Sequence, residues 1–211
     1  MKRLVLMIAF FSLLAAPAHA DGIVSMSFDD CTGPVTKAVL PGSQVDLYVS
    51  LIGQSEAHEA YQVALVLATH MPSDSGSFAP FPDAWRFEPT GCQGSSFLVL
   101  TPNPPAALSK GCPSFGPTPQ VSSSDFYFDP FFRVARITVA NSYNGRSADP
   151  GTRYHLAHLG FNQLYGVNGA GTPGATCGNL EQPMTIYIHS ASWIDLASNE
   201  HSWAGGLAPS S

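Results

Sequence analysis

Short segments that alternate apolar and polar residues, separated by breaks rich in proline and glycine, constrain the fold of this chain most. The segment QVDLYVSLI (44–52) places its valines and leucines on one side and Asp46, Tyr48 and Ser50 on the other, which is typical of a strand with one buried face. No window of about eleven residues combines a helical apolar repeat with a cap and a stop. Further strand candidates are 22–28, 61–68, 85–88, 95–101, 132–140, 153–161 and 184–190. The pattern predicts an all-β fold, an antiparallel β-sandwich of about 8–9 strands with long Pro/Gly-rich loops and little helix.

The first twenty residues have the layout of a secretory signal peptide. Lys2 and Arg3 precede the apolar run LVLMIAFFSLL (4–14), and Ala18-His19-Ala20 forms a small-x-small cleavage site. The run is too short to span a bilayer, so we expect no membrane span after cleavage. We therefore expect a signal peptide at 1–20, a single sandwich domain at 21–203 and a flexible tail at 204–211. The protein is expected to be secreted, to the periplasm or the extracellular space.

Charge disfavours two classes of partner. The chain has 211 residues with nine basic and fifteen acidic side chains, and two of the basic ones lie in the signal peptide. The mature chain therefore carries a net charge of −8. Such a chain repels phosphate backbones and anionic lipid surfaces, so neither a nucleic acid nor a membrane surface is an expected partner.

Four cysteines lie in the mature part of the chain: Cys31, Cys92, Cys112 and Cys177. An even number of cysteines in an exported protein favours two disulfides over free thiols. Of the three pairings, we prefer Cys92–Cys112, a short local closure, together with Cys31–Cys177. Zinc is the competing interpretation, but no two of these cysteines have CxxC-type ligand spacing. We expect no cofactor; acidic side chains and loop carbonyls would suffice for structural calcium, but no DxDxDG-like run identifies ligands.

The segment SMSFDDC (25–31) resembles the TFDD strand-end motif of polysaccharide deacetylases. That resemblance implies that Asp29 and Asp30 act as a base and a metal ligand, with two histidines completing the metal site. The nearest histidine pair is HLAH (155–158), which lacks the hydroxyl residue of the deacetylase motif. His155 and His158 lie on a strand candidate, where residues three apart point to opposite faces. We therefore expect a polar Asp-Asp turn here and no metal site.

The remaining candidate residues carry equally open interpretations. Other histidines (His58, His70, His189 and His201) lack ligand spacing, and no GxSxG elbow is present. Aromatic residues cluster in loops, where they could form a platform for a sugar or a protein, although core packing explains them as well. The candidates for ligand contact are Phe78, Phe81, Trp85 and Tyr127. No catalytic residue is predicted.

Two stretches of sequence resemble a known class of sandwich. AVLPGSQVDLYVSLIG (38–53) and AYQVALVLA (60–68) are similar to the opening strands of cohesin-type and related immunoglobulin-like domains, and VARITVANS (134–142) continues the pattern. TCGNLEQPM (176–184) resembles a feature of secreted bacterial β-sandwich proteins. The resemblance implies an immunoglobulin-like or cohesin/jelly-roll-like sandwich. The cysteines and the long Pro-rich loops depart from cohesins, so dockerin binding is not carried over.

These observations favour a secreted, non-catalytic binding or structural module of the bacterial envelope or extracellular space. Its partner would be an extracellular protein or a glycan. The alternatives are an enzyme that acts on extracellular polysaccharide, such as a deacetylase or another hydrolase, and a carbohydrate-binding module. An enzyme should gather two or more ionisable side chains in one cleft, whereas a module should present a flat or aromatic-lined face.

Overall fold

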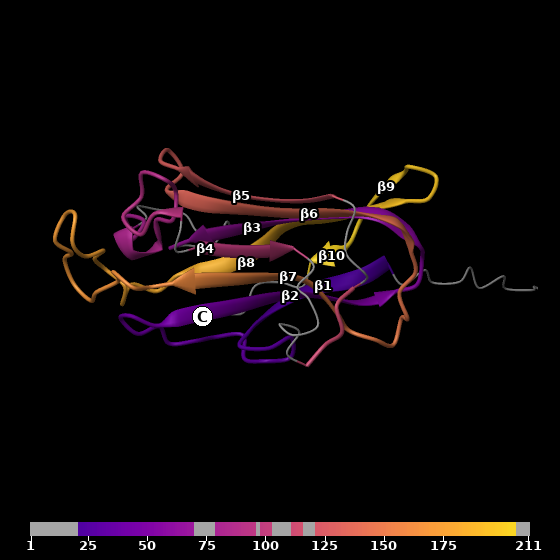
Figure 1. The fold of residues 1–211 in the computed structure, drawn as a ribbon, viewed down its shortest axis with the longest axis horizontal. Coiled ribbons are helices and arrows are strands. Elements are labelled where there is room, and N and C mark those ends of the chain that lie inside the picture. Colours follow the sequence, from indigo (N-terminus) through magenta and orange to yellow (C-terminus); the bar gives the residue numbers. More distant parts are fainter. Residues whose placement is uncertain (1–20, 70–78, 96–97, 103–110, 116–120, 206–211) are drawn as a thin grey trace, which may run out of the picture.

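Two β-sheets packed face to face make up the fold (Figure 1). The structure is a computed structural model and describes residues 21–69, 79–95, 98–102, 111–115 and 121–205. The strands run along the long axis of the molecule, and the loops gather at its two ends. This arrangement confirms the predicted all-β sandwich.

The first sheet, here called sheet A, has the strand order β10-β1-β2-β7-β4. Its neighbouring strands pair antiparallel except β1 and β10, which are parallel. Its strands are β1 (Asp21–Phe28), β2 (Gln44–Gln54), β4 (Leu98–Pro102), β7 (Tyr154–Asn162) and β10 (Ala204–Gly205).

The second sheet, sheet B, has the order β5-β6-β3-β8-β9, and all its neighbouring pairs are antiparallel. Its strands are β3 (His58–Ala68), β5 (Val121–Asp129), β6 (Val134–Arg146), β8 (Thr185–Asp195) and β9 (Glu200–Ser202).

The core lies between the two sheets and follows the alternation in the sequence. Val45, Leu47, Val49 and Leu51 are all buried on one face of β2, as the alternating pattern predicted. Trp193 on β8 is among the largest fully buried side chains. Burial of aliphatic and aromatic side chains from both sheets is the main stabilising contribution in a fold of this type.

Two local expectations were wrong. No strand forms at the candidate 85–88: Pro82 precedes a 3₁₀ turn, η1 (Asp83–Trp85), and Trp85 is buried in the core. Ala204 and Gly205, which were expected in the flexible tail, pair with Ile23 and Val24 of β1. The rest of the expected tail (206–211) and the expected signal peptide (1–20) lie outside the described residues.

All four cysteines form disulfides, but the preferred pairing was wrong. The bonds are Cys31–Cys112 and Cys92–Cys177, with sequence separations of 81 and 85 residues. The short closure fails because Cys112 lies on a segment that pairs with β7: Ser114 and His155 form a parallel bridge. Cys92 instead bonds to Cys177, which itself forms an isolated bridge with Gly166. Each disulfide therefore joins distant parts of the chain.

Candidate functional site

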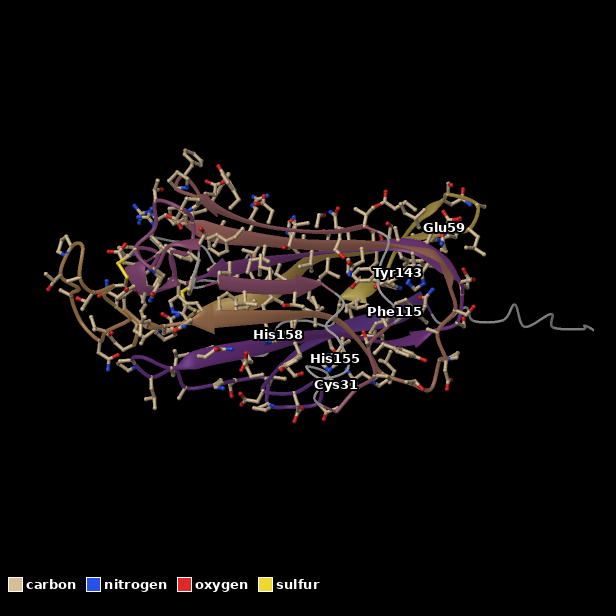
Figure 2. All side chains as sticks on the ribbon, in the orientation of Figure 1. Cys31, Glu59, Phe115, Tyr143, His155 and His158 are labelled. Carbon is tan, nitrogen blue, oxygen red and sulfur yellow. A yellow bond between two sulfur atoms is a disulfide. The ribbon has the colours of Figure 1, made fainter. Side chains whose placement is uncertain are left out.

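The outer face of sheet A carries a cluster of polar side chains around Tyr48. Its ring lies 5.0 Å from the His155 ring and 4.8 Å from the His158 ring, centroid to centroid. All three side chains are buried, with at most 6% of their surface exposed. In Figure 2, Cys31, His155 and His158 are grouped along β2 and β7, away from Glu59 and Tyr143.

A β-bulge brings the two histidines to the same face. Val49 pairs with Ala157 whereas Ser50 pairs with His155, so β7 has one extra residue, Leu156, opposite this step. An extra residue shifts the alternation of one strand by one position. The expectation that His155 and His158 point to opposite faces was therefore wrong.

The hydrogen bonds of His158 and Asp46 order one side of this cluster. His158 Nε2 lies 2.8 Å from Asp46 Oδ1, and Gln44 Nε2 donates to the same oxygen over 2.7 Å. Burial raises the pKa of Tyr48, and the negative charges of Asp46, Asp29 and Asp30 raise it further. Tyr48 is therefore held as a neutral phenol at neutral pH.

The Asp-Asp pair after β1 behaves as a polar turn. Asp29 forms an ion pair with Lys37, and Asp30 Oδ1 accepts a hydrogen bond of 2.8 Å from the backbone of Thr32. Within the described residues, neither aspartate belongs to a group of three or more potential metal ligands. The deacetylase-type set of Asp29, Asp30, His155 and His158 is thus not assembled.

One group of potential metal ligands does occur in the described part of the chain: Cys31, Cys112 and His155, all three buried. The two cysteines form a disulfide. Sequence spacing could not reveal this group, because its members come from the β1–β2 connection, the 111–115 segment and β7.

The aromatic candidates divide between core and surface. Phe81 and Trp85 are buried in the core, where their rings lie 5.2 Å from Phe128 and 5.5 Å from Phe161. Trp85 also lines a cavity of about 260 Å³ together with Phe28 and Met184, and the role of both residues in ligand contact stays a prediction. Tyr127 is 55% exposed, and its role in ligand contact stays a prediction. Phe78 lies outside the described residues.

The tip of the β5–β6 hairpin carries two exposed aromatics that were not among the site candidates. Phe131 is 84% exposed and Phe132 58%. The backbone N–H groups of both donate to Asp129 Oδ1 over 3.0 Å, which orders the tip. The signal for this feature was the turn sequence DPFFR, in which two aromatics follow an Asp-Pro pair.

Part of the outer face of sheet B differs from that of sheet A, because its side chains are small and largely uncharged, whereas the next row of the same face has larger side chains: Tyr127–Arg136–Val66–Tyr187. Three rows of cross-strand neighbours form a surface that we call the small-residue plateau: Val121–Ser142–Ala60–Ile194, Ser123–Ala140–Gln62–Ser192 and Asp125–Thr138–Ala64–Ser190. A shallow groove of about 300 Å³ runs over the first two rows. Glu200 is the one carboxylate among the described residues that line it.

Comparison with known proteins gives matches at the level of structure alone. Neither a family model nor a curated protein matches the sequence. A type II cohesin module from the ScaA scaffoldin of Acetivibrio cellulolyticus superposes with a TM-score of 0.43 and 11% identity, covering 88% of this chain and 93% of that one. A cohesin module from a family 33 glycoside hydrolase of Clostridium perfringens gives a TM-score of 0.40 and 10% identity, with 87% and 90% covered. Type II cohesin A11 from Bacteroides cellulosolvens gives a TM-score of 0.36 and 10% identity, with 89% and 96% covered. The β-sandwich described above thus has a weak structural similarity to type II cohesin modules.

Proposed function

We propose that this chain is an exported, non-catalytic binding module that docks an extracellular protein on the small-residue plateau of sheet B. The observation that carries the proposal is the composition of this open face. Gln62, Ser123 and Ser190 are exposed there, and alanines stand between them. A flat surface of short side chains lets another protein approach the sheet backbone closely, and its extent suits a protein better than a metabolite.

The edges of the plateau define the chemistry of the partner. Val121 is 66% exposed and Ile194 37%, so apolar side chains border the small residues. Asp125 and Glu200 add negative charge on the two edge strands. Protein interfaces combine an apolar centre with a polar rim. The partner is therefore expected to present an apolar strip flanked by basic side chains.

Export is supported by two features of the chain. The sequence begins with the pattern of a signal peptide, and both disulfides suit an oxidising compartment. No helix in the described part of the chain is long and apolar enough to cross a membrane. N-terminal sequencing of the exported protein tests the cleavage site directly.

Site-specific photo-crosslinking tests the docking face. A photoreactive benzoylphenylalanine at Gln62, in the middle of the plateau, should give one discrete adduct in the producing cells. The matched control position is Val99, which is 49% exposed on β4 of sheet A and should give none. A second substitution, Ala140→Arg, should abolish the Gln62 adduct without lowering the melting temperature by more than a few degrees.

Three results would contradict this function. Equal adducts from Gln62 and Val99 would show that contact is nonspecific, and the absence of any Gln62 adduct would remove the docking face. An adduct of twice the mass of the chain, formed by the purified protein alone, would identify a second copy as the occupant and overturn the proposal of a different partner.

Glycan binding is a second candidate function, favoured by a cavity beside the Cys92–Cys177 disulfide. A cavity of about 680 Å³ next to Cys92–Cys177 is lined by Asp83, Arg86 and Tyr165, and Tyr165 is 42% exposed. An accessible aromatic ring beside one acidic and one basic side chain suits a neutral sugar. Affinity electrophoresis in gels with soluble starch, xylan or mannan should then retard the wild type more than Tyr165→Ala. Equal mobility of the wild type and Tyr165→Ala in all three gels would exclude glycan binding at this cavity.

A further inference from the structure

We propose that the reduced form of this protein binds one Cu(I) ion through Cys31, Cys112 and His155. This inference goes beyond the docking function and does not depend on it. The Sγ atoms of the two cysteines and a ring nitrogen of His155 all lie within 4.8 Å of one another. The exposed fractions of the three residues are 1%, 6% and 0%, so the group is closed to bulk solvent.

Three separate parts of the chain hold these ligands in place. Cys31 follows the Asp-Asp turn after β1, where the backbone of Phe28 donates to Pro34 O over 2.8 Å. Cys112 lies on the 111–115 segment, which is joined to His155 by backbone hydrogen bonds on both sides: His155 N donates to Pro113 O, and Phe115 N donates to His155 O. The frame around the ligands therefore does not consist of the disulfide alone.

The same three residues can exist as a disulfide or as a metal site, but not as both. A thiol reductant would supply two electrons and two protons to the Cys31–Cys112 bond, giving two thiols and leaving the reductant as its own disulfide. Metal binding would then displace both thiol protons, while the neutral His155 ring donates a lone pair from one nitrogen.

The number and softness of the ligands select the ion. Thiolate sulfur prefers Cu(I) and zinc over hard cations. Zinc held by three protein ligands completes its four-coordinate shell with a water molecule, whereas this group of three ligands is buried away from bulk solvent. Cu(I) is satisfied by three ligands of the S₂N type, so we assign Cu(I) to the site.

The second disulfide provides a matched control within the same chain. Cys92–Cys177 has a similar sequence separation, but it belongs to no group of three potential ligands within the described residues. The variant C92A/C177A keeps the proposed site and C31A/C112A removes it. Both variants retain one pair of cysteines, so nonspecific thiol binding is equal in the two.

The experiment is an anaerobic titration of each protein, fully reduced with a phosphine, against Cu(I) held by bicinchoninate. C92A/C177A should take up one Cu(I) per chain. The Cu(I) affinity of C31A/C112A should be lower by more than about 100-fold, a larger loss than the substitution of a residue that only supports a metal ligand usually causes. Cu K-edge absorption of the loaded C92A/C177A should show two sulfur neighbours and one nitrogen. His155→Asn should remove the nitrogen signal.

Several outcomes would overturn the assignment. Equal affinity in the two double variants would show that any cysteine pair suffices, and a sulfur-only copper environment would remove His155 from the site. Unfolding of reduced C92A/C177A, seen by far-ultraviolet circular dichroism, would also overturn it, because the ligands converge only in the folded chain. Binding of Zn(II) but not Cu(I) would refute the choice of ion.

Discussion

Removal of either disulfide should destabilise the fold by a large and similar amount. The loops that they close span 81 and 85 residues, and the entropy of closing a chain of that length corresponds to about 4.5 kcal/mol at 25 °C for each bond. The difference between the two variants should come from packing. Cys31 and Cys112 are both buried, whereas Cys92 is exposed. C31A/C112A should therefore lose roughly 1 kcal/mol more than C92A/C177A, because buried sulfur leaves a void.

Urea denaturation of the wild type and the two variants measures these differences, with the slopes compared to confirm that the unfolded states are alike. Loss of less than about 1 kcal/mol in both variants would refute the view that the disulfides act by restricting the unfolded chain.

A third variant tests the pairing itself. C92A/C112A removes one cysteine from each disulfide seen in the structure, so Cys31 and Cys177 should both react as free thiols after unfolding. Under the pairing preferred from the sequence, the same variant would keep an intact Cys31–Cys177 bond and show no free thiol. A thiol count of zero would therefore contradict the structure.

Three further substitutions test other parts of the fold. Leu65→Ala empties a fully buried position at the centre of β3 and should lower the free energy of unfolding by about 2–5 kcal/mol in urea; a smaller loss would mean that the core collapses around the site. Trp203 Nε1 donates to the buried Gln54 Oε1 over 2.8 Å, so Trp203→Phe should lose about 1–3 kcal/mol, and Trp203→Phe combined with Gln54→Leu should recover part of it. Hydrogen bonds from Asn199, then from His201, hold the pKa of Asp195 well below its usual value. The resulting stabilisation is complete above roughly pH 4 and is lost as the pH falls toward the depressed pKa. The difference in stability between wild type and Asp195→Asn should therefore shrink on acidification, and a constant difference would contradict this.

Strand alternation could be predicted because it depends on local sequence. Val45, Leu47 and Leu51 are buried on β2 as the pattern requires, since a pleated strand turns successive side chains to opposite faces. The same reasoning failed for His155 and His158. One extra residue in β7 changes the face of everything beyond it, and the sequence carries no signal for a bulge at that point.

The disulfides and the aromatic cluster depend instead on the path of the loops. Cys112 meets Cys31 because the 111–115 segment runs beside β7, where Ser114 pairs with His155. The disulfide joins residues that are 81 positions apart in the chain. Trp85 and Phe81 are loop residues that turn inward, a choice that composition does not determine. Apolar residues in loops are thus ambiguous until the loop is placed against a sheet.

The two outer faces of the sandwich are used in different ways. On sheet A, Tyr48 and His155 are buried although both lie on the outer face, and the 111–115 segment, held by Cys31–Cys112, pairs with His155. On sheet B, Val121 and Ile194 remain exposed beside the small-residue plateau. Covering this face with another connection would bury more apolar surface and stabilise the isolated domain. The open face of sheet B therefore agrees with the docking function proposed for it, whereas on sheet A the buried polar residues lie beside the cysteine–histidine group.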